Sequence, residues 1–191
     1  MDITLSWDLF IIVFAVVIIA YSLIIGQDQT LKVILGTYVS AVAADAGGQL
    51  IGTYLGGSQL FMNLLNMVAV NNDDDATIIV KVAIFIVFVI LFAVKGAFEV
   101  DVSDDRPGLV RLFVSVLYGI MSAGLFISAI LIFISGISFV GGGSALTVKS
   151  ALSPIYNQSE IVKWMVQYTY FFFSIPALAF LFHSFHTARE Q

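Results

Sequence analysis

A chain of 191 residues that is 60% hydrophobic and only 11% charged cannot hide its apolar side chains in one soluble core, because a chain of this size keeps much of its surface exposed. Soluble domains are typically about 45–50% apolar and about 25% charged. The formal net charge of -5 excludes a general attraction to nucleic acid, and the lack of cysteine excludes disulfides, thiolate metal sites and cysteine nucleophiles. Composition therefore predicts that lipid surrounds most of the chain.

The first predicted helix contains an apolar run from Leu9 to Ile25, which Trp7 and Asp8 precede. A bilayer is spanned by about 20 apolar residues, and a tryptophan suits the interface at the start of such a span. Ser6 or Asp8 can cap the first turn, because their side-chain oxygens accept hydrogen bonds from free backbone N–H groups. We therefore predict a transmembrane helix over residues 7–25.

The second predicted helix, over residues 30–56, carries a small residue at every fourth position. Residues four apart share one face of a helix, so this face forms a groove that lets another helix approach closely in lipid. At about 1.5 Å per residue a helix of this length reaches about 40 Å, which exceeds the hydrocarbon core of about 30 Å. We expect a tilt or a break at Gly47–Gly48. The groove residues are Gly36, Ser40, Ala44, Gly48, Gly52 and Gly56.

Asp45 lies beside this groove and is the sharpest functional candidate in the chain. A carboxylate near the middle of a membrane costs about 2.5–3.5 kcal/mol, so it should face the bundle interior or a cavity. There it can act as a proton or ion relay, or it can be a structural carboxyl that bonds to Thr37, Tyr38 or Ser40. A break at Gly47 would instead bring Asp45 to the interface.

Two polar features separate the second and third predicted spans. Residues 58–70 place apolar side chains at helical spacing opposite a polar face, which predicts a short amphipathic helix in the interface. The run 71–75, Asn-Asn-Asp-Asp-Asp, is the most polar stretch of the chain. It is either a cation site or, since EF-hand spacing is lacking, a solvated turn whose last aspartate caps the next helix. We favour the turn.

Two further spans are predicted over residues 77–98 and 109–140. Lys81 and Lys95 lie near the two ends of the first of these, where lysine stems can extend to the interface. The second carries small residues on part of its face. We expect this helix to pack into the groove of the second span through Gly119 and Ala123.

The fifth predicted segment covers residues 161–185 and contains Pro176, so it either crosses as a kinked helix or dips in and returns. We favour crossing. His183 and His186 share a helix face at its end and could bind a metal, but the sequence offers no third ligand nearby, and we favour an ordinary polar helix end. Lys and Arg are more numerous on one side of the five spans, which predicts the N-terminus outside and the C-terminus inside.

Three stretches carry a likeness to a known family: the opening run Asp8–Ile12 closed by Gly26, the helix start Leu109–Leu112 with Tyr118–Ile120, and the segment Ser150–Pro154. They resemble the colicin V production protein family over roughly residues 1–155. The turn after Gly26 lacks the basic residues and second glycine usual there, and the fifth segment is extra to a four-helix core. The resemblance implies an integral inner-membrane protein associated with toxin export or envelope homeostasis, without enzymatic chemistry.

These features predict an all-α fold: a polytopic integral membrane helical bundle of four to five transmembrane helices with a short interfacial amphipathic helix, forming a single membrane domain over residues 1–191. We expect a non-enzymatic scaffold, envelope-homeostasis or toxin-export component of the bacterial cytoplasmic membrane, with the bilayer and a second copy or another membrane protein as partners. The alternative is a small channel or proton-linked transporter that uses Asp45. The residues point to no cofactor, no metal, no catalytic group and no nucleic-acid partner.

Overall fold

The computed structural model describes residues 6–55, 58, 73–95, 108–135, 138–139 and 158–187. Over these ranges the fold is all-helical, as predicted. The helices are α1 (Trp7–Ile25), α2 (Gln27–Leu55), α4 (Asp73–Lys95), α5 (Gly108–Ile134), α7 (Glu160–Gln167) and α8 (Thr169–Thr187). The predicted amphipathic helix over residues 58–70, Gly56 and the family-like segment Ser150–Pro154 lie outside the described residues, except for Ser58.

Three of the described helices are long and apolar enough to cross a membrane: Trp7–Ile25, Thr77–Lys95 and Leu109–Ile134. The bent pair Glu160–Gln167 and Thr169–Phe182 adds a fourth candidate if it counts as one span. The chain is therefore a helical membrane protein. The predicted second span is not among these candidates, because polar side chains along α2 make it less apolar than α1, α4 and α5.

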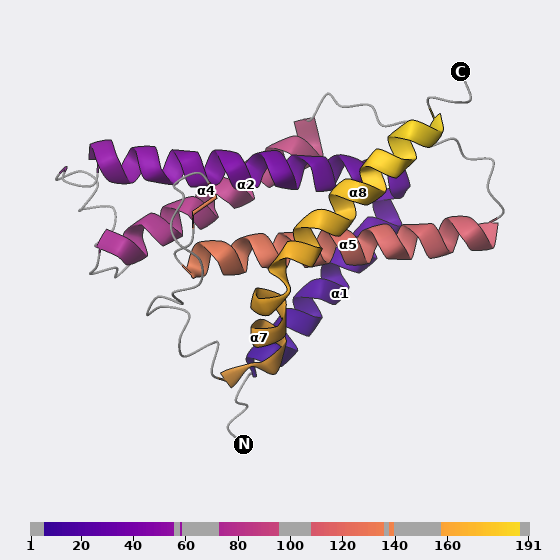
Figure 1. Cartoon of the computed structure of the whole chain (residues 1–191), viewed down its shortest axis with the longest axis horizontal. Helices are drawn as coiled ribbons and strands as arrows, with labels where there is room; N and C mark the ends of the chain where they lie inside the picture. Colours follow the sequence, from indigo (N-terminus) through magenta and orange to yellow (C-terminus); the bar gives the residue numbers. More distant parts are fainter. Residues whose placement is uncertain are drawn as a thin grey trace.

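The helices α2 and α5 run side by side in the same direction, and α4 lies antiparallel against α2 (Figure 1). The most extensive packing joins α2 to α4 and α1 to α5. A single residue, Gly26, connects α1 to α2 with a φ of 85°. Side chains rarely tolerate this left-handed conformation, so the glycine allows α1 to end and α2 to start without a longer loop.

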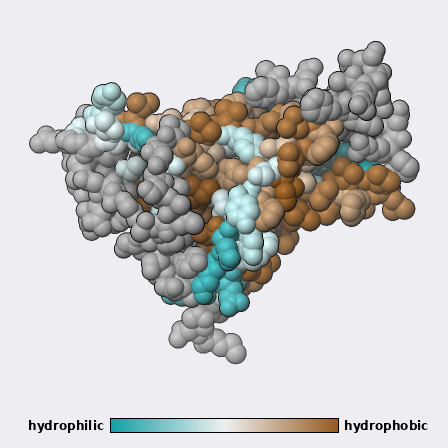
Figure 2. All heavy atoms as spheres, in the orientation of Figure 1, coloured by the Kyte–Doolittle hydropathy of each residue, from teal (hydrophilic) through white to brown (hydrophobic). Residues whose placement is uncertain are grey.

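Apolar side chains fill the spaces between the helices and also cover much of the outside. One buried cluster joins α1, α5 and α7 through Ile11, Ile127 and Val162. Large hydrophobic side chains on the outer faces of α1, α4 and α5 are exposed, and brown apolar surface covers much of the coloured part of the view in Figure 2. Such a surface suits contact with lipid tails rather than water.

Several predicted boundaries differ from the structure. The aspartates of the polar run are the first residues of α4, which begins at Asp73, so they belong to the helix and not to a preceding turn. The predicted span 109–140 ends earlier, because α5 stops at Ile134. His183 and His186 lie in the last turns of α8, and their side chains are outside the described part.

The last segment bends at a different place from the one expected. The 58° change of direction lies between α7 and α8, at Tyr168, whereas α8 continues through Pro176. The Tyr38 hydroxyl of α2 donates to the Phe173 carbonyl oxygen at 2.5 Å, one turn before this proline. The helix α2 thus adds a hydrogen bond to the backbone of α8 in the turn before the proline, as neighbouring helices commonly do in membrane proteins.

Asp8 joins the start of α1 to the start of α7. Ser6, not Asp8, caps α1, since its Oγ accepts from the Leu9 N–H at 3.2 Å. The Asp8 Oδ1 instead accepts hydrogen bonds from the Ser159 Oγ and, at 3.4 Å, from the Ile161 N–H. Ser159 is fully buried and caps α7, so this carboxylate fixes the position of α7 against α1.

We expect Asp8→Ala to lower the free energy of unfolding in detergent micelles by about 1.5–3 kcal/mol, the usual contribution of hydrogen bonds to a charged group. Asp28→Ala is the matched control, because Asp28 is an exposed first-turn acid of α2. A denaturant titration followed by circular dichroism measures both variants. Equal losses in the two variants would contradict the role given to Asp8.

Candidate functional site

Asp45 on α2 and Lys81 on α4 form an ion pair inside the bundle. The Lys81 Nζ donates to the Asp45 Oδ1 at 2.6 Å. The Asp45 side chain is 0% exposed and that of Lys81 is 8% exposed. Two opposite charges that leave water together are held strongly, because the low local dielectric strengthens their attraction.

The second oxygen of Asp45 is bonded by two polar side chains. The Ser138 Oγ, just beyond the end of α5, donates to Oδ2 at 2.7 Å, and the Gln49 Nε2 lies 3.5 Å from the same oxygen. Gln49 also donates to the Ser138 Oγ at 2.5 Å. The carboxylate therefore receives hydrogen bonds from α2, from α4 and from the chain that follows α5.

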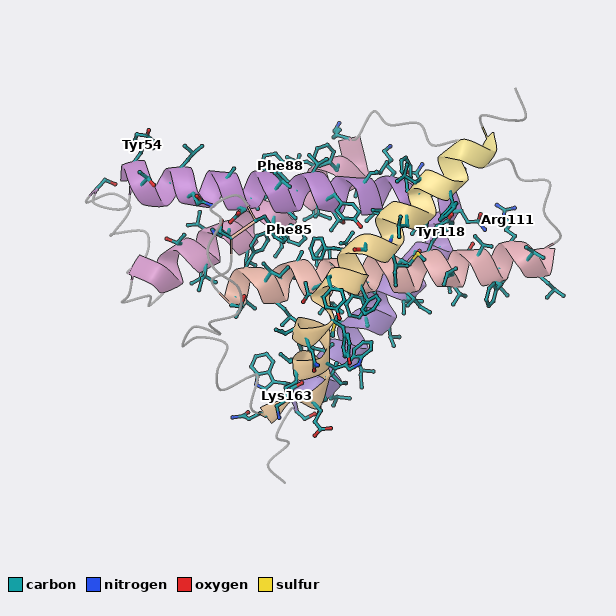
Figure 3. All side chains as sticks on the ribbon, viewed as in Figure 1. Tyr54, Phe85, Phe88, Arg111, Tyr118 and Lys163 are labelled. Atoms are coloured by element: carbon teal, nitrogen blue, oxygen red, sulfur yellow. The ribbon has the colours of Figure 1, made fainter. Side chains whose placement is uncertain are left out.

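A buried apolar cluster closes one side of this polar group. It contains residues that precede Asp45 on α2, follow Lys81 on the antiparallel α4, and precede Ser138 on α5, so all of them lie toward the same end of the bundle. Phe85, labelled in Figure 3, packs its ring on those of Phe126 and Phe133. The cluster residues are Ala41, Ala44, Phe85, Val89, Ala129 and Phe133.

The small-residue groove of α2 accommodates α4. A Cβ atom on Gly36 would lie 2.7 Å from the Phe92 Cβ, and one on Gly52 would lie 3.3 Å from the Thr77 Oγ1. At Gly48 an added Cβ would overlap the Cγ of Lys81. The groove is therefore the space through which the lysine stem reaches Asp45.

The predicted partner of this groove was wrong. The residue of α5 expected to enter it, Gly119, faces α1 instead, since an added Cβ would lie 3.3 Å from the Ser22 Cβ. Ala123 is buried, and α5 contacts α2 less extensively than α4 does. The charge on Lys81 explains why α4, and not α5, occupies the groove, because α4 brings the cation that neutralises Asp45.

The structure confirms that Asp45 faces the bundle interior, but its predicted neighbours were wrong. Thr37 donates to the Val33 carbonyl at 2.7 Å, Tyr38 bonds to α8, and the buried Ser40 hydroxyl has no hydrogen-bond partner among the described residues. No break occurs at Gly47, since α2 is continuous. A role of Asp45 in relaying protons stays a prediction.

Three residues of the site were missed from the sequence. Lys81 was expected to extend to the interface, but it turns inward because Asp45 is buried opposite it. Gln49 follows Asp45 by one helical turn, a spacing at which helix side chains meet, so this signal was present. The sequence contains no such signal for Ser138, because this residue reaches Asp45 only through the packing of α5.

The arrangement can hold and release a proton, since it contains a carboxylate, an ammonium group and a hydroxyl in hydrogen-bonding contact. Among the described residues, no group of three His, Asp or Glu side chains lies together to hold a metal ion. No family model, no curated protein and no solved structure matches the chain. The resemblance to the colicin V production family therefore remains an expectation, and the site defines the class of protein only as a membrane helical bundle with a buried ion pair.

We expect Gly48→Ala to destabilise the protein in detergent far more than Gly47→Ala. The new methyl at position 48 would displace the Lys81 stem, combining overpacking, which typically costs about 1–3 kcal/mol, with strain on a buried ion pair. At position 47 the nearest atom is the flexible Cδ1 of Ile84, at 3.2 Å. Unfolding titrations compare the two, and similar midpoints would show that the groove does not position Lys81.

Proposed function

We propose that this chain is a small, non-enzymatic protein of the bacterial cytoplasmic membrane that carries out proton-linked transport centred on Asp45. The supporting observation is the buried ion pair between Asp45 and Lys81. Acids and bases inside membrane bundles typically mark proton or ion pathways. The N-terminus lies outside and the C-terminus inside in this proposal, as the distribution of Lys and Arg suggests.

Stability alone is a weak reason to keep such a pair. Placing one charged Asp or Lys at the centre of a membrane helix costs about 2.5–3.5 kcal/mol. Pairing offsets this cost, yet replacing a buried ion pair by apolar side chains of similar volume is often neutral or stabilising by about 1–4 kcal/mol. A function that needs charged side chains therefore accounts for this ion pair better than stability does.

Protonation of Asp45 offers a coupling between chemistry and helix packing. The ionised carboxylate attracts Lys81 and so holds α4 against α2 across their long contact. A protonated Asp45 can keep its hydrogen bonds to Ser138 and Gln49 but loses this attraction. Proton uptake then weakens one helix contact selectively, which is the kind of two-state element that transport requires.

A scaffold or envelope-homeostasis role, as in the colicin V production family, is the second candidate. It is favoured by the same pair, because a buried ion pair can fix which helices associate and in which register. The groove would not bind the partner, since α4 already fills it. A second copy or another membrane protein would instead meet an exposed apolar face such as that of α1, with Val13, Val16 and Val17.

We expect Asp45→Asn to lower proton flux into reconstituted vesicles by about tenfold or more, because the group that accepts the proton is lost. A pH-sensitive dye trapped in the vesicles measures the flux, and Asp28→Asn on the exposed start of α2 is the control. Equal flux in the wild type, Asp45→Asn and protein-free vesicles would reject proton-linked transport.

The double variant Asp45→Asn/Lys81→Gln separates the two candidates. Asp45→Asn alone leaves Lys81 buried without its counter-charge, which typically costs about 3–5 kcal/mol, and the second change removes that penalty. If the pair acts only in packing, the double variant regains both stability and function in cells. If Asp45 carries protons, the double variant regains stability but not flux.

A further inference from the structure

Resting on the proposed proton-linked function, we infer that protons reach Asp45 from one side of the bundle only, through the Ser138 hydroxyl, to which Gln49 also donates a hydrogen bond. This side is the end of the bundle where α2 ends and α4 begins. Tyr54, 79% exposed, marks that end in Figure 3, and Arg111 marks the opposite one.

Exposure increases along the hydrogen-bonded chain from Asp45 outward. Asp45 and Lys81 are buried, whereas Gln49 and Ser138 are half-buried. Ser138 lies beyond the last residue of α5, at the margin of the helical bundle. The polar path from the carboxylate therefore leads toward the surface in this direction.

Two buried apolar clusters lie in the opposite direction. The apolar cluster around Phe85 and Phe133 lies directly next to Asp45. A second cluster, formed by Leu31, Ile34, Tyr118 and Leu125, continues between α2 and α5 toward Gln27. At that far end the Gln27 Nε2 donates to the Arg111 carbonyl at 2.7 Å and to the Ser115 Oγ at 3.1 Å, so these polar groups satisfy one another.

The length of α2 agrees with access from this side. At about 1.5 Å per residue, Asp45 is about 15 Å from Leu55 along the helix and about 27 Å from Gln27. The three consecutive aspartates that begin α4 are at the near end as well, and negative charge raises the local concentration of cations. In the proposed orientation, with the N-terminus outside, this end of the bundle lies on the outer side of the membrane.

The proton passes through the Ser138 hydroxyl. Ser138 Oγ accepts a proton from a hydronium ion at the surface, which leaves as water, while its own O–H bond breaks and that proton forms an O–H bond with Asp45 Oδ2, 2.7 Å away. Ser138 is unchanged at the end of the step. Asp45 becomes neutral, Lys81 keeps its charge, and the pair changes from neutral to singly positive.

We expect Ser138→Ala to slow proton flux about tenfold or more, because a positioned proton donor typically contributes at least that factor, while Ser138→Thr, which keeps the hydroxyl, stays near the wild-type rate. Ser135→Ala is the matched control: its buried hydroxyl donates to the Ile132 carbonyl at 2.6 Å and does not reach Asp45. Wild-type flux in Ser138→Ala would overturn the inference while leaving the proposed function standing.

Access is tested separately by thiol labelling, because the chain has no cysteine and each introduced thiol is unique. In sealed vesicles of known orientation, a membrane-impermeant maleimide should label Ser138→Cys from the same side as Tyr54→Cys and from the side opposite to Asp28→Cys. Labelling of Ser138→Cys from the Asp28 side, or no labelling at all, would overturn the inference. Correct labelling without any wild-type flux would reject the proposed function and support this access route alone.

Discussion

Charge neutralisation between α2 and α4 is the constraint on which the rest of the bundle depends. Asp45 is tolerated at full burial because Lys81 lies 2.6 Å away, and Lys81 reaches it because Gly48 leaves room for its stem. Three features allow this contact: the small residues of α2, the antiparallel placement of α4, and the position of the chain after α5. Removing either charge would leave the other buried without compensation.

The groove on α2 shows how a sequence pattern can have a use different from its usual one. A stripe of small residues in a membrane helix commonly allows close approach of two backbones. Here the stripe admits side chains of α4 at Phe92, Lys81 and Thr77. The groove thus positions the charged Lys81 side chain and also packs apolar side chains of α4. The same groove therefore supports both the fold and the proposed proton chemistry.

Much of the fold was predictable because lipid imposes strong rules on composition and length. The extent of α1 and the inward position of Asp45 both follow from apolar runs and the cost of a buried charge. The predicted start of the second helix at residue 30 was wrong, because α2 begins at Gln27 and only Gly26 separates it from α1. The identity of the partner helix did not follow. Helical periodicity predicts which face of a helix is buried, but it does not predict which other helix packs there. The contacts of Lys81 and Ser138 with Asp45 therefore could be identified only from the structure.

The shared direction of α2 and α5 has an electrostatic consequence. Both helices have their C-terminal ends at the same end of the bundle, and α5 stops at Ile134, four residues before the serine that bonds Asp45. Free carbonyl groups give a helix C-terminus about half a negative charge. The negative pole of α5 thus lies toward the end of the bundle from which Ser138 bonds Asp45, and it favours retention of the ammonium group during the interval in which the carboxyl is neutral.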